Sequence, residues 1–237
     1  MKIAIIGYGK MGKEIEAIAI ERGHEICAKL TSSDKGFGKN ELNDADAAIE
    51  FTRPEFAVEN IKACFNASVP VIVGTTGWYD DFEQIKQDCQ TKKGAILSAT
   101  NFSLGVNIFW KANEYLASIM NTQPSYNVSM EEIHHTQKLD APSGTAITTA
   151  EKIINQVDRK TSWSLDTENS PEELKIEAKR LPDVPGTHEV FYSNEIDTIS
   201  MKHEANSRKG FALGSVLAAE FIKDKQGVFT MNDLLKF

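Results

Sequence analysis

The sequence predicts an α/β protein in which an N-terminal doubly wound parallel sheet precedes a second α+β domain with a mixed sheet. Three observations predict this fold class. Short apolar runs alternate with amphipathic segments up to residue 100, and a glycine turn follows the first run. Beyond Asn101 this alternation gives way to longer strands of mixed polarity. A chain of 237 residues can hold two modest domains, or one domain with a large insertion.

The first half of the chain predicts strands and helices in turn. The isoleucine-rich run 2–6 is typical of a parallel strand buried on both faces. Apolar side chains then recur at helical spacing from Met11 to Ala19, and Gly23 is suited to end that helix. The further elements expected are strands at 24–31, 46–52, 70–77 and 94–100 and helices at 54–68 and 79–93. Strands that alternate with helices in this way imply a doubly wound parallel sheet.

The second half has a different pattern. The elements expected there are a helix at 106–120, a strand at 126–133, a helix at 144–157, and a hairpin formed by 187–194 and 197–205. Within the polar region 158–186, only 174–180 is expected to form a strand. The final helix, 211–222, is apolar almost all round, so we expect it to be buried against the first sheet.

Composition excludes several classes of protein. The formal net charge is -8, which disfavours a nucleic-acid partner because such binding needs a cationic face. Three cysteines without a C-x-x-C pair suggest neither a disulfide framework nor a zinc ribbon. No apolar run is long enough to cross a bilayer, and the N-terminus lacks a signal-peptide core. We therefore expect a cytoplasmic protein with no membrane partner.

Gly7, Gly9 and Gly12 form a G-x-G-x-x-G turn between the first strand and the first helix. Gly7 permits a tight turn, Gly9 leaves room for a pyrophosphate, and Gly12 allows the helix to pack closely on the strand. The helix N-terminus would face the phosphate charge. In this context the turn favours dinucleotide binding over a purely structural role.

The end of the second strand bears on the choice of dinucleotide. An acid there would hold the ribose hydroxyls of NAD, but the chain offers Thr31, Ser32 and Ser33. Lys10 and Lys35 are near in sequence and suit the 2′-phosphate of NADPH, unless they are only solvated loop residues. The expected cofactor is NADPH or NADH, with a slight preference for NADPH.

Two further turns follow expected strands, at the sheet edge where ligands bind in such folds. Gly74 and Thr75 either approach a nicotinamide ribose or form a capped turn before the next helix. Asn101 either bonds a carboxamide or caps the helix that follows it. The residues alone leave both alternatives open.

The segment 131–145, EEIHHTQKLDAPSGT, concentrates polar chemistry. Adjacent histidines on a strand point to opposite faces, and no further metal-ligand spacing accompanies them, so we predict no metal site. The turn 142–145 lies where a helix begins, and its amides and hydroxyls can hold a carboxylate or phosphate even if Ser143 also caps that helix. Lys138 beside His134 can attract an anionic substrate and supply the proton that hydride reduction of a C=N or C=C bond requires.

These fragments together resemble the dihydrodipicolinate reductase family, also called 4-hydroxy-tetrahydrodipicolinate reductases. The similarity covers the whole chain and rests on IGYGKMG, IEFTRPE, VIVGTTG, ATNFSLGVN, EIHHTQKLDAPSGTA and HEANSRKGFALGSVLAAEFI. It implies a Rossmann-type dinucleotide domain at 1–104 completed by 209–237. It also implies a substrate-binding and oligomerisation domain at 105–208 whose sheet builds a homotetramer. The implied reaction is hydride transfer from NADH or NADPH to a cyclic dicarboxylate imine in diaminopimelate and lysine biosynthesis.

The resemblance also implies roles for residues that match by position. His134 would be the proton donor and acceptor, and Lys138 a proton donor. The implied substrate contacts are His135, Ser143, Gly144, Thr145 and Arg208. The implied cofactor contacts are Gly7, Tyr8, Gly9, Lys10, Met11, Gly12, Thr31, Gly74, Thr75, Thr76, Ala99, Thr100, Asn101 and Phe102. The chain departs from the common family pattern in its glycine turn, one residue shorter with lysine for arginine, in Thr31, and in a shorter segment before residue 185.

Two rival functions are weighed against this one. Another NAD(P)-dependent amino-acid-type dehydrogenase would have no reason for Lys138 beside the Ser143-Gly144-Thr145 turn. A non-catalytic NAD(P)-sensing protein would keep the glycine turn but need no histidine and lysine beside an anion-binding turn.

Overall fold

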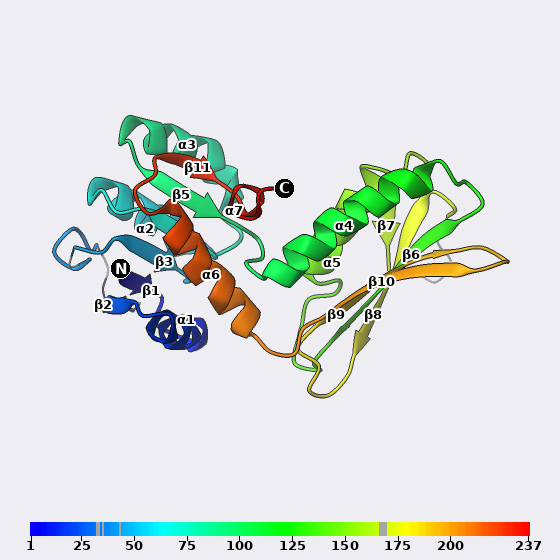
Figure 1. Cartoon of the computed structure of the whole chain (residues 1–237), viewed down its shortest axis with the longest axis horizontal. Helices are drawn as coiled ribbons and strands as arrows, with labels where there is room; N and C mark the ends of the chain where they lie inside the picture. The colour runs from blue at the N-terminus through cyan, green and yellow to red at the C-terminus, as the bar shows by residue number, and fades with distance from the viewer. Residues whose placement is uncertain (32–33, 35, 43, 166–169) are drawn as a thin grey trace. The chain divides into compact units, whose positions relative to one another are not determined.

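The computed structural model describes residues 1–31, 34, 36–42, 44–165 and 170–237. The chain divides into two compact units, Met1–Leu104 with Lys209–Phe237, and Gly105–Arg208 (Figure 1). Among the described residues, no helix is long and apolar enough to cross a membrane.

The first unit is built on a six-stranded sheet in the order β11-β5-β4-β3-β1-β2, in which neighbouring strands pair in parallel. Its strands are β1 (Lys2–Ile6), β2 (Glu25–Leu30), β3 (Ala47–Glu50), β4 (Val71–Val73), β5 (Ala95–Ser98) and β11 (Gly227–Phe229). Its helices are α1 (Lys10–Glu21), α2 (Pro54–Asn66), η1 (Tyr79–Asp81), α3 (Phe82–Thr91), α6 (Lys209–Ile222) and α7 (Met231–Leu235). The chain order reverses between β1 and β3, which is where such sheets bind ligands.

Alternation along the short apolar strands buries both faces of this sheet. Ile3 and Ile5 of β1 pack with α1 and α6, whereas Ala4 and Ile6 pack on the other side with α2 and α3. The late helix α6 therefore completes the core begun by the first strands, and its expected return to the first sheet is confirmed (Figure 1). Two C-terminal elements, β11 and α7, were not predicted because each is too short to show a period.

The second unit has a mixed five-stranded sheet in the order β10-β9-β6-β8-β7. Strand β6 pairs antiparallel with β9 and parallel with β8, so the predicted mixed sheet is confirmed. The strands are β6 (Asn127–His134), β7 (Ser162–Ser164), β8 (Glu173–Arg180), β9 (Thr187–Ser193) and β10 (Thr198–Glu204), and the helices are α4 (Leu104–Asn121) and α5 (Gly144–Ile154). The expectation of a single strand within 158–186 was wrong, because this region also contains the edge strand β7. That strand was missed because three residues are too few to show a period in the sequence.

One face of this sheet forms the core with α4 and α5. Every second residue of β6 is buried, beginning with Val128 and Met130, which pack among apolar side chains of both helices. The last two positions of this buried row are Glu132 and His134. The strand period that builds the core therefore also turns two polar side chains inward at the strand's end.

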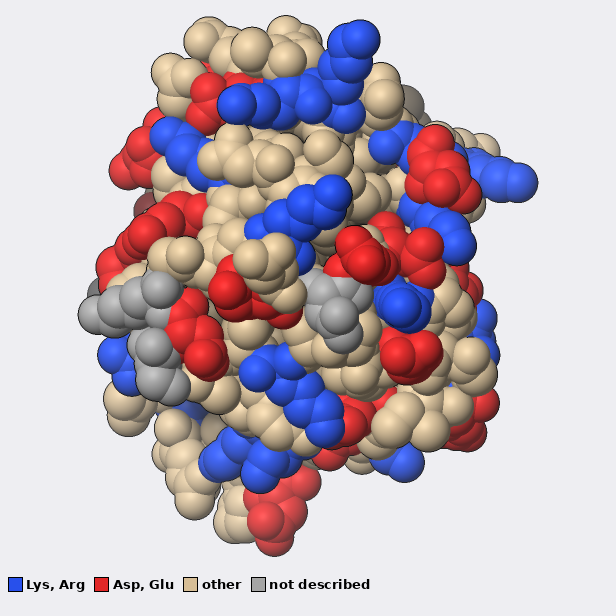
Figure 2. Space-filling model, turned by 90° about the vertical axis from the view of Figure 1, so that its left-hand side faces the viewer, with Lys and Arg blue, Asp and Glu red and all other residues tan. Residues whose placement is uncertain are grey.

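On the face that Figure 2 shows, lysine and arginine side chains are interspersed with aspartate and glutamate. This mixed pattern agrees with the acidic composition and differs from the continuous cationic face that nucleic-acid backbones require.

We expect Gly214→Ala to destabilise the first unit. Alanine ordinarily favours a helix over glycine by about 1 kcal/mol, but a Cβ at 214 would lie 1.7 Å from the carbonyl oxygen of Phe102. Because the backbone must move, the free energy of unfolding should fall by roughly 2 kcal/mol in a urea titration. Gly210→Ala in the same helix is the control, since its Cβ would lie 3.3 Å from the movable hydroxyl of Ser103. Equal losses in the two variants would contradict this packing argument.

Candidate active site

Two grooves at the carboxyl edge of the parallel sheet share Gly7 and Gly9. The larger has a volume of about 610 Å³ and is also lined by Tyr8 and Thr31. The smaller has a volume of about 400 Å³, and the predicted residues that line it besides the shared glycines are Lys10, Met11, Gly74, Thr75 and Thr76. The fold thus gathers residues from the turns after β1, β2 and β4 in one place.

The three glycines of the first turn are required for different reasons. Gly7 has a φ of +96°, and a Cβ there would lie 2.0 Å from the Phe51 carbonyl oxygen. At Gly12 a Cβ would lie 2.6 Å from the Gly7 carbonyl oxygen, so both positions are fixed by packing. At Gly9 a Cβ would meet nothing within 4 Å. The fold leaves Gly9 facing open space, as close approach of a ligand requires.

The N-terminus of α1 fits a pyrophosphate. Gly9 precedes the helix without a side-chain cap, and the first turn contains no acid. The amides of a first helical turn lack intrahelical partners and favour negative charge. These features, together with the open space at Gly9, suit a dinucleotide.

A carboxylate does lie at the end of β2, although the strand itself ends without one. Asp34 Oδ2 accepts hydrogen bonds from the Thr31 amide at 2.7 Å and from the Thr31 hydroxyl at 2.8 Å. These bonds hold the pKa of Asp34 below its ordinary value. Asp34 also lines the larger groove. Sequence reasoning missed it because it comes from the loop rather than the strand; Ser32, Ser33 and Lys35 lie outside the described residues.

The predicted residues after β5 have structural contacts of their own. Asn101 is buried, and its Oδ1 accepts a bond from the Ser103 amide at 2.8 Å, which forms a turn just before α4. Phe102 is 2% exposed and packs against Phe51 in the core. Ala99 and Thr100 link these residues to β5. Asn101 thus forms a turn before α4, and both roles considered for it, a carboxamide contact and a helix cap, stay predictions.

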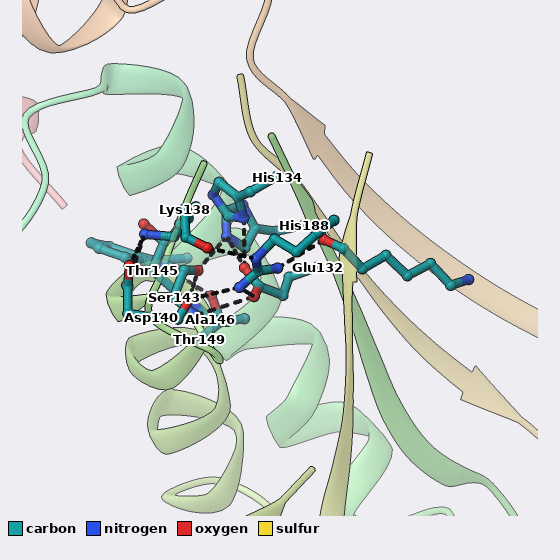
Figure 3. Close-up of polar contacts among 12 residues, drawn as sticks. Glu132, His134, Lys138, Asp140, Ser143, Thr145, Ala146, Thr149 and His188 are labelled. Atoms are coloured by element: carbon teal, nitrogen blue, oxygen red, sulfur yellow. Dashed lines mark hydrogen bonds and ion pairs between the residues drawn. The ribbon is translucent and has the colours of Figure 1, made fainter. Parts of the chain in front are cut away.

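In the second unit, a buried carboxylate lies among groups from four elements (Figure 3). Glu132 Oε2 lies 2.6 Å from Nδ1 of His134 on the same strand and 3.9 Å from Nε2 of His188 on β9. Arg180 of β8 donates to Glu132 Oε1 at 2.9 Å, and the Ser143 amide before α5 donates to it at 3.3 Å. Burial opposes ionisation of Glu132, but bonds from His134, Ser143 and Arg180 hold its pKa at about 2. The carboxylate is therefore charged at neutral pH.

His188 is the neutral member of this cluster. Burial, followed by the neighbouring His134 charge, lowers the pKa of His188 to about 3. Its Nε2 lies 3.1 Å from Oγ of Ser143. That Oγ accepts a hydrogen bond from the Ala146 amide and so caps α5. Ser143 therefore has the capping role that the sequence allowed, and His188 fixes the cap.

The loop between β6 and α5 presents the remaining predicted groups. Lys138 Nζ donates to both carboxylate oxygens of Asp140, at 2.8 and 2.7 Å. Gly144 is exposed at the start of α5, and a Cβ there would meet nothing within 4 Å. Thr145 follows it in the first turn (Figure 3). A cation and an open helix N-terminus thus flank the buried carboxylate.

The adjacent histidines lie apart, as expected for neighbours at a strand end. His134 is 8% exposed and joins the buried cluster. His135 instead lines a groove of about 340 Å³ together with Arg208 and Asp183. Two of the predicted substrate contacts are therefore brought together in this groove.

Glu132, His134 and His188 also form a group of described residues whose donor atoms lie within 4.8 Å of one another. The 2.6 Å between Glu132 Oε2 and His134 Nδ1 is shorter than the roughly 3.3 Å that separates two donors around a tetrahedral zinc ion. Arg180 also occupies the other carboxylate oxygen. This geometry suits a charged pair better than a metal shell.

Comparison with known proteins identifies the family. Residues 1–102 match the family model described as dihydrodipicolinate reductase, N-terminus, and residues 105–235 match the model of its C-terminus. A 4-hydroxy-tetrahydrodipicolinate reductase of Christiangramia forsetii is 49% identical over 99% of this chain and 98% of its own length. The chain belongs to the dihydrodipicolinate reductase family. It is therefore an NAD(P)H-dependent oxidoreductase of lysine and diaminopimelate biosynthesis, which confirms the function predicted from sequence.

Further relatives of this reductase agree with that assignment. A 4-hydroxy-tetrahydrodipicolinate reductase of Archaeoglobus fulgidus is 34% identical, with both chains covered in full. The solved structure of a dipicolinate-bound dihydrodipicolinate reductase from Paenisporosarcina sp. TG-14 has a TM-score of 0.80 at 23% identity and covers 97% of each chain. An amine dehydrogenase from Mycobacterium smegmatis has a TM-score of 0.62 at 10% identity, over 97% of this chain and 94% of its own. Dehydrogenases of other activity thus share the reductase fold.

A further buried acid lies at the end of β3, in the first unit of this reductase. Glu50 is fully buried at the end of β3, accepts a bond from the Thr52 hydroxyl, and accepts another from Asn60 at 3.2 Å. Thr75 Oγ1 accepts the Thr52 amide bond at 2.7 Å, which joins the turns after β3 and β4. Burial raises the pKa of Glu50, although bonds from Thr52, Thr75 and Asn60 oppose the shift. The sequence signal for this role was a single acid in an apolar strand.

We expect Glu50→Gln to make stability less dependent on pH. The pKa of Glu50 is raised in the folded state, so the unfolded carboxyl ionises first as pH rises and the wild-type protein loses stability over that range. Glutamine keeps a carbonyl acceptor for Asn60 and does not ionise. Urea unfolding should be measured at about pH 4 and about pH 7. The free energy of unfolding of the variant, relative to that of wild type, should be larger at the higher pH. Glu55→Gln, at an exposed position on α2, is the control. The expectation would be contradicted if Glu50→Gln and wild type differed in free energy of unfolding by the same amount at both pH values.

Proposed function

We propose that this reductase transfers hydride from NADH or NADPH to the cyclic imine derived from 4-hydroxy-tetrahydrodipicolinate, giving tetrahydrodipicolinate. The first unit would hold the dinucleotide, and Gly105–Arg208 would hold the dicarboxylate and form the oligomer. The observation that carries the proposal is the cluster of Glu132, His134 and Lys138 beside the open N-terminus of α5.

The proposed cofactor contacts follow from the grooves of the first unit. The amides of Lys10, Met11 and Gly12 at the start of α1 would hold the pyrophosphate over Gly9. Thr31 and Asp34 would meet the adenosine ribose, and the turn Gly74–Thr76 would meet the nicotinamide ribose. The bound dinucleotide supplies the hydride.

The proposed substrate contacts use the two anion-binding features of the second unit. The Gly144 and Thr145 amides would hold one carboxylate at the helix N-terminus, with Ser143 fixing that turn. His135 and Arg208 would hold the other, because they share a groove. Each hydride added to the ring must be matched by a proton, and Lys138 and His134 would supply and relay it. Asp140 would hold the Lys138 ammonium until substrate displaces it.

We also propose a cytoplasmic homotetramer assembled through the sheet of the second unit. The support is the edge strand β10, along which five of seven residues are exposed. Sedimentation of the purified protein would measure the number of copies.

Purified protein should oxidise NADPH or NADH only when supplied with the product of dihydrodipicolinate synthase. Lys138→Ala should reduce kcat by about a hundredfold, because a general acid contributes at least that much. Dinucleotide affinity should persist, since the glycine turn lies in the other unit. Lys152→Ala, on α5, is the matched control. Cofactor binding without turnover would refute the reductase proposal, and a near-normal rate for Lys138→Ala would remove this lysine from it.

Asp34 should set the ratio of NADH to NADPH use. A carboxylate at the ribose repels a 2′-phosphate, so wild type should use NADH at least as efficiently as NADPH, which reverses the slight preference for NADPH expected from the sequence. Asp34→Asn should raise the relative kcat/KM for NADPH about tenfold, the equivalent of about 1.4 kcal/mol. Asp88→Asn, on α3, controls for net charge. An unchanged ratio in Asp34→Asn would show that this carboxylate does not meet the ribose.

A further inference from the structure

We propose that Glu132 and Arg180 are positioning residues, which hold His134 and the Lys138 loop in a single arrangement. Neither residue was assigned a role from the sequence. The inference rests on the proposed function, because the proton-handling roles of His134 and Lys138 belong to it.

The first step concerns the imidazole. Glu132 is fully buried and its Oε2 lies 2.6 Å from Nδ1 of His134, so the carboxylate occupies the Nδ1 side of the ring. The proton that is exchanged must then use Nε2. A Cβ at Gly186 would lie 3.0 Å from this Nε2, so the absence of a side chain at 186 leaves room beside it. The carboxylate thus fixes the direction of the ring and leaves Nε2 as the nitrogen available for exchange.

The second step concerns the loop. The Arg180 Nη2 that binds Glu132 also donates to the Asp140 carbonyl oxygen at 2.6 Å, and Nε donates to that of Lys138 at 3.4 Å. Asp140 in turn binds the Lys138 ammonium. The Arg180 guanidinium therefore connects the loop backbone to the Glu132 carboxylate that orients His134. The buried charge of Glu132 thus positions both His134 and the Lys138 loop.

The same two strands carry a second ion pair, which can be compared with that of Glu132 and Arg180. Glu131 and Lys179, each one residue earlier, form an ion pair on the opposite face of the sheet, with side chains 22% and 41% exposed. This outer pair joins the same two strands with the same spacing and charges, but it contacts neither His134 nor the loop. Exposed pairs contribute little to stability, so the outer pair is a matched control for the inner one.

The test compares Glu132→Gln with Glu131→Gln in steady-state kinetics. We expect kcat of Glu132→Gln to fall about 10- to 100-fold, with KM for NADH unchanged. His134 is faced by Glu132, by His188 from β9 and by Arg180 from β8. Glutamine removes the only negative charge among these groups, so the pH–kcat profile of Glu132→Gln should differ from that of wild type. Glu131→Gln should keep both kcat and the profile.

A second variant separates positioning from folding. Arg180→Ala should lose kcat to a similar extent and regain part of it in millimolar guanidinium, which can occupy the vacated site; Lys179→Ala should show neither effect. If wild type is inactive with the imine substrate, the proposed function fails. If wild type is active while Glu132→Gln keeps its rate and pH profile, or Arg180→Ala is not rescued, the positioning role is refuted.

Discussion

The burial of one ionised carboxylate constrains the whole polar end of the second unit. A charge removed from water costs several kcal/mol unless other charges and donors surround it. Glu132 meets that requirement with an arginine from β8, an imidazole from its own strand and an amide from the start of α5. Of these groups, Arg180 comes from a strand far along the chain. The register of β6 with β8 and the starting point of α5 are therefore not free to vary, because a shift of either would leave the charge without a partner.

The first unit solves a different problem with backbone geometry. The dinucleotide proposed for it would approach the backbone itself, so the important positions are those without side chains. At Gly7 and Gly12 a side chain would clash with atoms of the protein, whereas at Gly9 it would not. That difference separates glycines that build the turn from the one that leaves it accessible. The acid Glu50 then ties two neighbouring turns together from below.

Local patterns in the sequence were sufficient for most of the fold. Periods of two and of about 3.6 residues located β6, α5 and the return of α6, because these segments are long and have one buried face. Strands β7 and β11 escaped because three residues carry no period. In the site, glycine spacing and the family signature indicated the cofactor turn, His134 and Lys138. Arg180 and His188 could not be predicted, because only the pairing of the strands brings them beside Glu132. The position of Glu132, two residues before His134, did place these two side chains on one face of the strand. Asp34 was missed because a loop carries it back to the strand end.

The order of the two units along the chain affects how the protein is made. Gly105–Arg208 is continuous, whereas the sheet of Met1–Leu104 lacks α6 and β11 until Lys209–Phe237 has been synthesised. One face of that sheet, with Ile3 and Ile5, stays uncovered by α6 while the second unit emerges from the ribosome. It follows that the second unit can complete its core first on the ribosome, and that the sheet of the first unit is covered only after residues 209–237 have been synthesised. A truncated product would therefore expose apolar sheet surface and be a natural target for chaperones and proteases.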